Sequence, residues 1–523
     1  MERRPVSDSP KERLGQAPRW KRLYIVLCLV LFLPVVFFAF SRPYELGYDF
    51  WETAATVREL AARPFHPTNP ILALPERDAG RFVPYTVFWG LFKRLTGLGI
   101  FPTMALAAAA NYWLFVFGLY RFVSRQFKSE SLPSFLLVTM LLVWGKGYQY
   151  ASAYHLEMFL VTSPYVGFFC FGLSLLALSY LTAYCDNGAW RNLVLYAVFS
   201  IIGFVTHAPA GVFCYVTAGA VLLARGNVRR LVLMQGVPLL ALGACLVWPY
   251  FSFLDLFFSA TTKGTFPAFF TKRQVRALGP ALVGIPIVAY DAVRRRHLFV
   301  CLGFLFCLAI YLVAIVGRIA FVARFIIFIG FFLQVGIALF MDRSFVGSAA
   351  GVRRRLGWQR GVALVVAVGL LIPSVYFRWV EMDRHVERVV GGKYGVHRYL
   401  SPARNLFFLA RHVSYGDVVI TDPREGWPVP AISGARVVAP LYFMALFSGS
   451  YEARRTDVRE FFEGDLSLEA REAIVDKYGV THILVNLRRQ KRWDESFRRD
   501  LDALGIEIGR DGPMVLYEVA AGD

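Results

Sequence analysis

The stretch SRPYELGYDFWETAATVRELAARPFHPTNPILALPERDAGRFVPY, residues 41–85, follows the first apolar run and decides how the rest of the chain is interpreted. On a helix of about 3.6 residues per turn over 47–62, its apolar and acidic side chains fall on opposite sides. We expect the apolar stripe to lie in a membrane interface and the acidic stripe to face a water-filled cavity. The apolar stripe is Leu46, Phe50, Ala54, Val57 and Ala61, and the acidic stripe is Glu45, Asp49, Glu52, Thr56 and Glu59.

The composition predicts a polytopic membrane protein. The 523 residues are 56% hydrophobic and only 18% charged, with a mean hydropathy of +0.48, which excludes an ordinary soluble globular protein. The net charge of +20 would suit a nucleic-acid-binding protein. However, the basic clusters lie between apolar runs, as in the cytoplasmic loops of membrane proteins. We therefore expect a lipid bilayer, and no nucleic acid, as a partner.

Apolar runs predict about eleven membrane spans, with the N-terminus cytoplasmic and the C-terminus outside. Residues 1–22 form a basic cytoplasmic tail, and every predicted cytoplasmic loop carries Arg or Lys. The run 23–40 is interpreted as a retained first helix, because Ser41-Arg42-Pro43 is a poor signal-peptide cleavage site. All seven cysteines lie in or beside the spans and are interpreted as buried apolar residues. The predicted spans are 23–40, 102–122, 132–144, 165–184, 193–205, one ending at 225, 231–250, 281–292, 298–316, 325–341 and 362–377.

Residues 378–523 predict a small extracytoplasmic α/β domain. Short apolar runs at 417–422 and 481–486 are of the buried-strand type, 436–439 is weaker, and 513–519 is a last candidate strand. Helical periodicity occurs at 466–478 and 493–504. These elements predict a partly parallel sheet. The domain lacks a Gly-rich phosphate loop, so we assign it no nucleotide.

This layout resembles the C-type (GT-C) superfamily of polytopic membrane glycosyltransferases, which includes protein mannosyltransferases, aminoarabinose transferases and arabinofuranosyltransferases. The resemblance covers 23–377. It depends on an acidic residue on a juxtamembrane helix, on Arg81-Phe-Val-Pro-Tyr85, on the outer loop after the third span and on Thr206-His-Ala-Pro209. The run KYGVTHILVN, 477–486, is similar to outer domains of some bacterial members.

The resemblance implies an enzyme of the bacterial inner membrane. Such an enzyme takes a sugar from a polyprenyl-phosphate-linked donor and transfers it, with inversion, to a glycan, lipid or protein acceptor at the extracytoplasmic face. Two other classes remain open: a transporter or flippase of a lipid-linked substrate, and a non-catalytic envelope assembly protein. Transporters often contain internal repeats, and we find none between the halves of this sequence.

The resemblance assigns the general base to Asp49, which matches the position of the family's catalytic acid. The alternative is that Asp49 only caps its helix, since Asp49-Phe-Trp-Glu52 has capping-box-like spacing. Glu52 is a second candidate base or part of a solvated face. Glu157 is the second acidic residue that the resemblance implies, for donor or acceptor binding, and His155 is a further candidate for catalysis or acceptor binding. Alternatively, Glu157 is an interfacial carboxylate paired with His155 or Lys146.

A departing lipid phosphate needs cations to stabilise its charge. Arg318 and Arg324 bracket a turn between two spans, where charged groups are costly unless paired or functional; the alternative is snorkelling to lipid head groups. A divalent metal stays open with Asp49, Glu157 and a histidine, but no tight ligand spacing supports one. The candidate phosphate-binding residues are Arg324, Arg318, Arg81, Lys263 and Lys272.

Overall fold

The computed structural model describes residues 10–41, 48–73, 81–145, 154–254, 278–294, 296–317, 322–346, 403–440, 451–488 and 495–520, with a few isolated positions between them. The chain forms two units. The helical unit comprises Met1–Phe37, Ala108–Cys245 and Gly264–Asp383, and the loop unit comprises Phe38–Ala107, Leu246–Lys263 and Arg384–Asp523. The first outer loop therefore shares a unit with the C-terminal region. The predicted domain limits at residues 22 and 378 stay predictions.

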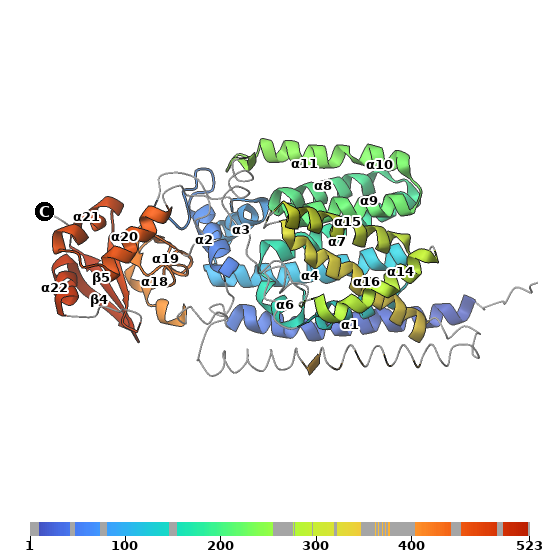
Figure 1. Ribbon diagram of the computed structural model, residues 1–523, viewed down its shortest axis with the longest axis horizontal. Helices are drawn as coiled ribbons and strands as arrows, with labels where there is room; N and C mark the ends of the chain where they lie inside the picture. Colours follow the sequence, from blue (N-terminus) through green and yellow to red (C-terminus); the bar gives the residue numbers. More distant parts are fainter. Residues whose placement is uncertain are drawn as a thin grey trace, which may run out of the picture. The chain divides into compact units, whose positions relative to one another are not determined.

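Long apolar helices build most of the helical unit, which contains all or a large part of α1 (Pro10–Ser41), α4 (Ile100–Phe127), α5 (Leu132–Leu142), α6 (Leu156–Thr162), α7 (Val166–Asn187), α8 (Trp190–Thr206), α9 (Ala208–Ala224), α10 (Val228–Met234), α11 (Gly236–Leu246), η3 (Gly279–Val283), α14 (Gly284–Val293), α15 (Leu298–Val316), η4 (Val322–Phe325) and α16 (Ile326–Phe345). Helix α7 packs on α8 and α9, and α15 packs on α9 and α16 (Figure 1). Helices with apolar residues on every side are typical of a protein core or a membrane.

Two glycines let α4 and α7 approach closely. A Cβ atom at Gly118 would lie 2.7 Å from the carbonyl oxygen of Gly172, and a Cβ atom at Gly172 would lie 2.9 Å from the backbone nitrogen of Phe115. Small residues allow two helix backbones to pack directly in membrane proteins.

The apolar helices agree with a multi-pass membrane protein. Among the described residues, six helices are long and apolar enough to cross a membrane: Arg19–Phe40, Ile100–Phe127, Val166–Asn187, Val228–Leu246, Leu298–Val316 and Val322–Phe345. Shorter apolar helices lie at the predicted spans 132–144, 193–205 and 281–292, and before residue 225. The last predicted span, 362–377, lies outside the described residues apart from isolated positions. The side of the membrane on which each end lies stays a prediction.

The C-terminal part of the loop unit contains a five-stranded sheet with the strand order β2-β1-β3-β5-β4. Strands β1 (Val418–Thr421), β2 (Arg436–Val437) and β3 (His482–Asn486) are parallel, and β5 (Met514–Val519) is antiparallel to both β3 and β4 (Gly505–Asp511). The expectation of a partly parallel sheet is confirmed. Strand β4 was not predicted, because its alternation is broken by exposed charged residues and glycines at an edge.

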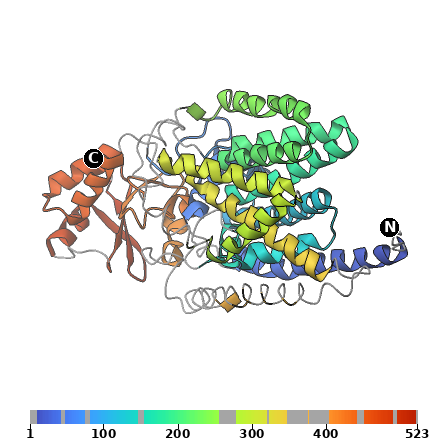
Figure 2. The ribbon, with the colours of Figure 1, turned by 45° about the vertical axis from the view of Figure 1, so that its right-hand side comes forward.

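Three helices cover one face of this sheet: α20 (Tyr451–Glu463), α21 (Leu468–Tyr478) and α22 (Glu495–Leu504) (Figure 2). Their side chains Phe461, Val475 and Leu501 form one core with Ile420 and Ile483 of the strands. Since successive strand residues point to opposite faces, this core takes alternate residues of β1 and β3. The short elements η5 (Ala403–Leu406), α18 (Leu409–His412) and α19 (Val429–Ser433) complete the region.

The first outer loop contains two packed helices, α2 (Tyr48–Ala62) and α3 (Pro84–Thr96). A Cβ atom at Gly90 of α3 would lie 2.5 Å from Cβ of Leu60, so only glycine permits this approach. The predicted interfacial stripe of α2 is wrong: Phe50, Ala54 and Val57 are buried, and the Phe50 ring stacks on Phe101. Helix α2 is enclosed because it also packs on α19.

Helix α3, by contrast, carries exposed apolar side chains. Phe88, Leu91 and Leu95 recur at helical spacing, and Leu95 is 85% exposed. Lys93 and Arg94 follow in the last turn. Helix α3 therefore carries the exposed apolar stripe that was expected of α2, but with basic rather than acidic residues beside it.

Candidate functional site

The site is built around Arg81, whose guanidinium lies between two carboxylates of α2. Its Nη2 atom is 2.6 Å from Oε2 of Glu52 and 3.7 Å from Oδ1 of Asp49. The Glu52 side chain is 8% exposed, whereas those of Asp49 and Arg81 are 32% and 36% exposed. The group therefore has one buried acid and one acid that solvent or a substrate can reach.

The local sequence explains why the two acids share a face. Residues three positions apart lie on the same side of a helix, and α2 begins at Tyr48, so Asp49 and Glu52 both project from its first turns. Thr53 and Thr56 donate hydrogen bonds back to the carbonyl oxygens of Asp49 and Glu52, at 2.6 and 2.8 Å. Asp49 lies inside the first turn, where the helix dipole favours a negative charge; its side chain pairs with Arg81 rather than with Glu52.

Arg81 is fixed by the start of α3. The Thr86 hydroxyl donates to the Arg81 carbonyl oxygen at 2.6 Å and accepts from the Val83 amide at 3.0 Å. The indole of Trp248 donates to the Phe82 carbonyl oxygen at 2.7 Å. Sequence reasoning missed both Thr86 and Trp248. Thr86 follows Val83-Pro84 at the spacing of a capping box, a signal that could have been found, but nothing local indicated Trp248.

Burial and opposing charges act against each other on the pKa values of Glu52 and Arg81. Burial raises the pKa of Glu52, and Arg81 offsets part of that effect. Burial works against the charge on Arg81, but the carboxylates of Glu52 and Asp49 outweigh it and raise the pKa of Arg81 above its ordinary value. With both carboxyl groups ionised, the three side chains carry a net charge of about −1.

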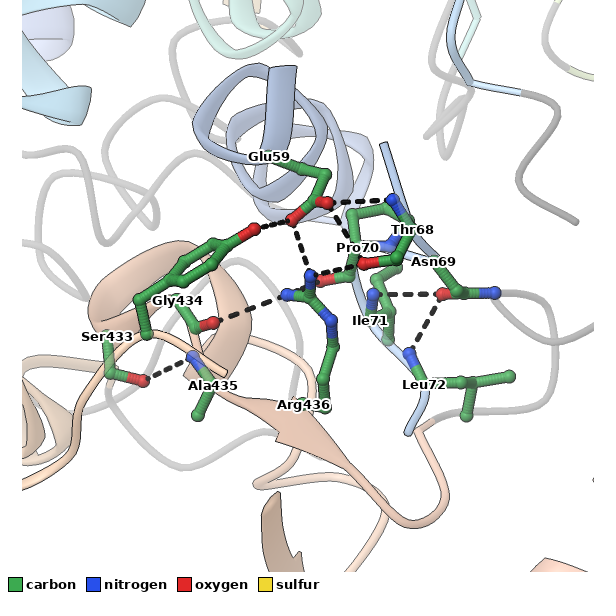
Figure 3. Close-up of polar contacts among 11 residues, drawn as sticks. Glu59, Thr68, Asn69, Pro70, Ile71, Leu72, Ser433, Gly434, Ala435 and Arg436 are labelled. Atoms are coloured by element: carbon green, nitrogen blue, oxygen red, sulfur yellow. Dashed lines mark hydrogen bonds and ion pairs between the residues drawn. The ribbon is translucent and has the colours of Figure 1, made fainter. Parts of the chain in front are cut away.

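Glu59, two turns further along α2, is part of a different structure. Its carboxylate accepts hydrogen bonds from the Tyr415 hydroxyl at 2.6 Å, the Thr68 amide at 2.8 Å and the Thr68 hydroxyl at 3.0 Å. It also forms a short ion pair with Arg436 of β2 (Figure 3). Burial would raise the pKa of Glu59, but Arg436, Tyr415 and Thr68 together lower it. The expectation that Glu59 faces a water-filled cavity is wrong, because the carboxylate is buried among these donors.

The segment after α2 extends the C-terminal sheet. The Val437 amide donates to the Ile71 carbonyl oxygen at 2.7 Å, and the Ala73 amide donates to the Val437 carbonyl oxygen at 3.3 Å. Leu72 and Val437 form a parallel bridge, and Arg454 of α20 donates to the Ala73 carbonyl oxygen at 3.0 Å. The loop that carries Asp49 therefore forms hydrogen bonds directly with the C-terminal sheet and with α20.

The other predicted site residues lie in the helical unit or outside the described part of the chain. His155 is buried at the start of α6, with its ring 6.4 Å from that of Trp144, and Arg324 is half-buried in η4. Glu157 belongs to α6, but its side chain lies outside the described residues, as do Arg318, Lys263 and Lys272. Within the described residues, no three His, Cys, Asp or Glu side chains gather in a way that could hold a metal ion.

No protein-family model and no curated protein matches this sequence. Among solved structures, ArnT from Cupriavidus metallidurans aligns over 96% of this chain and 98% of its own, with 15% identity and a TM-score of 0.55. The Archaeoglobus fulgidus oligosaccharyltransferase, tethered with an acceptor peptide, aligns over 89% of this chain and 69% of its own, with 13% identity and a TM-score of 0.55.

A third solved structure, the arabinofuranosyltransferase AftD from mycobacteria, aligns over 96% of this chain and 40% of its own, with 15% identity and a TM-score of 0.55. At such identities the likeness shows the fold. The chain has the fold of polytopic GT-C membrane enzymes, as the resemblance in the sequence implied.

Proposed function

We propose that this protein is a membrane glycosyltransferase of the GT-C type. It transfers a sugar from a polyprenyl-phosphate-linked donor to an acceptor hydroxyl, with Asp49 as the general base. The observation that carries the proposal is the partly exposed Asp49 carboxylate, held by Arg81 on the first turn of α2, in a chain with this fold.

The similar structures support the class of reaction but not one substrate. One is an oligosaccharyltransferase that carries an acceptor peptide, and another is an arabinofuranosyltransferase. The groups named in these two descriptions, an oligosaccharide and an arabinofuranose, differ, so for this protein we specify only a glycan, lipid or protein acceptor. Pocket shape, rather than the catalytic group, sets such specificity.

In the proposed reaction, Asp49 accepts the proton of the acceptor hydroxyl as its oxygen attacks the anomeric carbon. The bond between that carbon and the phosphate oxygen breaks, and the electron pair leaves with polyprenyl phosphate. Attack from the face opposite the phosphate inverts the anomeric centre, and Asp49 then loses its proton to solvent. Arg324 and Arg318, with Lys263 and Lys272, are the proposed cations for the leaving phosphate.

The proposed setting is the bacterial inner membrane. The basic N-terminal tail lies in the cytoplasm, and the first outer loop and the C-terminal domain lie on the extracytoplasmic side. This orientation follows from the distribution of Arg and Lys between the apolar runs.

The test uses purified full-length protein in nanodiscs with undecaprenyl-phosphate mannose, arabinofuranose and 4-aminoarabinose as probes. Wild type should release undecaprenyl phosphate from at least one donor, and Asp49→Asn should lower release at least about 100-fold, as for loss of a general base. Asp476→Asn, at an exposed position of α21, is the matched control and should retain full turnover.

Two results would contradict the proposal. Turnover that survives in Asp49→Asn would move the base elsewhere: to Glu157, or to Glu52 if its enclosed carboxylate becomes accessible during the reaction. Movement of an intact donor across a sealed vesicle, with no bond cleavage, would instead identify a transporter.

A further inference from the structure

We propose that Arg81 is a positioning residue that holds the Asp49 carboxylate and is itself anchored by Glu52, rather than a ligand of the donor phosphate. This inference deepens the proposed function and takes from it the role of Asp49 as the base. It replaces two assignments made from the sequence, Arg81 as a phosphate ligand and Glu52 as a second base.

The two contacts of Arg81 are unequal. Its Nη2 atom lies 2.6 Å from the buried Glu52 carboxylate and 3.7 Å from the more exposed Asp49 carboxylate. The short contact fixes the guanidinium against the protein interior, and the longer contact restrains Asp49 while leaving it accessible. Glu52 is too enclosed to meet an acceptor hydroxyl. It therefore acts on the reaction indirectly, chiefly through its short contact with Arg81 and also by charge repulsion with Asp49.

The charge balance argues against phosphate binding. In the described part of the chain, the ionisable groups in contact with Arg81 are Glu52 and Asp49. With both carboxyl groups ionised, the three groups carry about one net negative charge. A phosphate at Arg81 would be repelled by two carboxylates. Withdrawing the guanidinium to meet a phosphate would also leave Glu52 buried and uncompensated, which is strongly unfavourable.

The backbone around Arg81 is also restrained. Thr86 holds the Arg81 carbonyl oxygen and Trp248 holds that of Phe82, so two successive peptide groups are tied. Arg81 is therefore restrained at both its main chain and its guanidinium. Such a residue can hold Asp49 in place, whereas a ligand of a moving lipid head group would need a side chain that is free to move.

Two measurements that need no turnover test the inference. The first is the rate at which a water-soluble carbodiimide couples glycine ethyl ester to Asp49, read by peptide mass spectrometry. The second is the dissociation constant of undecaprenyl phosphate for protein in nanodiscs. The variants are Arg81→Met, Glu52→Gln and the double variant. The control is Arg94→Met, because Arg94 is an exposed arginine of the same loop that donates to the carbonyl oxygens of Ala61 and Ala62.

The single variants should change Asp49 labelling in opposite directions. In Arg81→Met the carboxylate loses its partner, so labelling should rise severalfold. In Glu52→Gln the Arg81 guanidinium has Asp49 as its remaining ion-pair partner. The Arg81–Asp49 ion pair should therefore tighten, and labelling of Asp49 should fall. The double variant should label close to Arg81→Met, because without the guanidinium Glu52 acts on Asp49 only through their direct charge repulsion. A loosened fold would raise labelling in every variant and cannot produce this pattern.

Undecaprenyl phosphate should bind Arg81→Met with a dissociation constant within about threefold of wild type. Where the proposed turnover is measurable, kcat of Arg81→Met should fall at least about tenfold, and Arg81→Lys should recover part of it. Arg81→Met leaves Glu52 buried and charged, and this can prevent folding. In that case the Glu52→Gln/Arg81→Met double variant, which lacks the buried charge, takes the place of Arg81→Met in both measurements.

A tenfold or greater rise in the dissociation constant of Arg81→Met, with Arg94→Met unchanged, would make Arg81 a phosphate ligand and overturn the inference. Labelling that rises in Glu52→Gln would overturn the anchoring role of Glu52. If wild type releases no undecaprenyl phosphate from any donor, the proposed function fails, whereas labelling and binding still decide the role of Arg81.

Discussion

Replacing Arg436 with methionine should open the junction between the first outer loop and the C-terminal sheet. Arg436 is the cation that pairs with buried Glu59, and it also donates to the Thr68 hydroxyl at 3.1 Å and to the Gly434 carbonyl oxygen at 3.3 Å. Methionine keeps the apolar stem but removes every donor. Glu59 would then stay buried without its cation.

We expect Arg436→Met to lose about 3–5 kcal/mol of stability, the usual effect of removing one partner of a buried ion pair. The loss falls on the contacts between residues 71–73 and β2, so it should appear as local opening rather than only as global unfolding. Hydrogen exchange of the Val437 and Ala73 amides, which form hydrogen bonds across that junction, should become about 100- to 4000-fold faster. A Glu59→Gln/Arg436→Met double variant should recover part of the loss, because no charge stays buried.

The pH dependence gives a second check. In wild type the pKa of Glu59 is lowered, so its contribution to stability is complete above the unfolded value of about 4.3 and is lost as the pH falls through the folded value. In Arg436→Met the largest opposing effect is gone and burial raises the pKa of Glu59. The carboxyl then takes up a proton in the folded state, so this variant should gain stability as the pH falls. The difference in unfolding free energy between wild type and Arg436→Met should therefore become smaller as the pH falls from 7 to 4.

The matched control is Arg455→Met. Arg455 lies on α20, its side chain is 56% exposed and its ion pair with Glu452 is 4.0 Å long, so its loss should change exchange by less than about 0.5 kcal/mol. The reasoning is refuted if the Val437 amide exchanges as slowly in Arg436→Met as in Arg455→Met. It is also refuted if the difference in unfolding free energy between wild type and Arg436→Met is the same at pH 7 and pH 4.

Further predictions concern the packing of α2 and α3. Gly90→Ala should destabilise the protein by about 1–3 kcal/mol despite alanine's better helix propensity, because the new Cβ atom would lie 2.5 Å from Cβ of Leu60. The thermal midpoint should fall, whereas Gly99→Ala, whose Cβ atom would have ordinary contacts, should leave it unchanged; equal midpoints would contradict the prediction. Thr86→Val should cost about 1–2 kcal/mol through two lost hydrogen bonds. Exchange of the Val83 amide measures this, and unaltered protection there would show that Thr86 does not hold the Arg81 turn.

The likeness between α2 and α3 shows where amphipathic pattern misleads. Both helices have an apolar side, and the side of α2 was expected to meet the membrane interface. In the structure that side is covered by residues such as Phe101, whereas Leu95 of α3 is exposed. A pattern indicates that a face avoids water, but protein and lipid satisfy that requirement equally.

The sequence alone determined the features that depend on neighbouring residues. Apolar runs located the apolar helices of the described residues, since a span must satisfy its backbone internally and be apolar along its whole length. Short β-branched runs located β1 and β3, and the three-residue spacing put Asp49 and Glu52 on one helical face. The tertiary structure decided which charges meet. Arg81 reaches both acids through a turn held by Trp248, and Glu59 meets Arg436, 377 positions away in the sequence. No local pattern encodes such pairs, because they form only when distant segments pack and exclude water together.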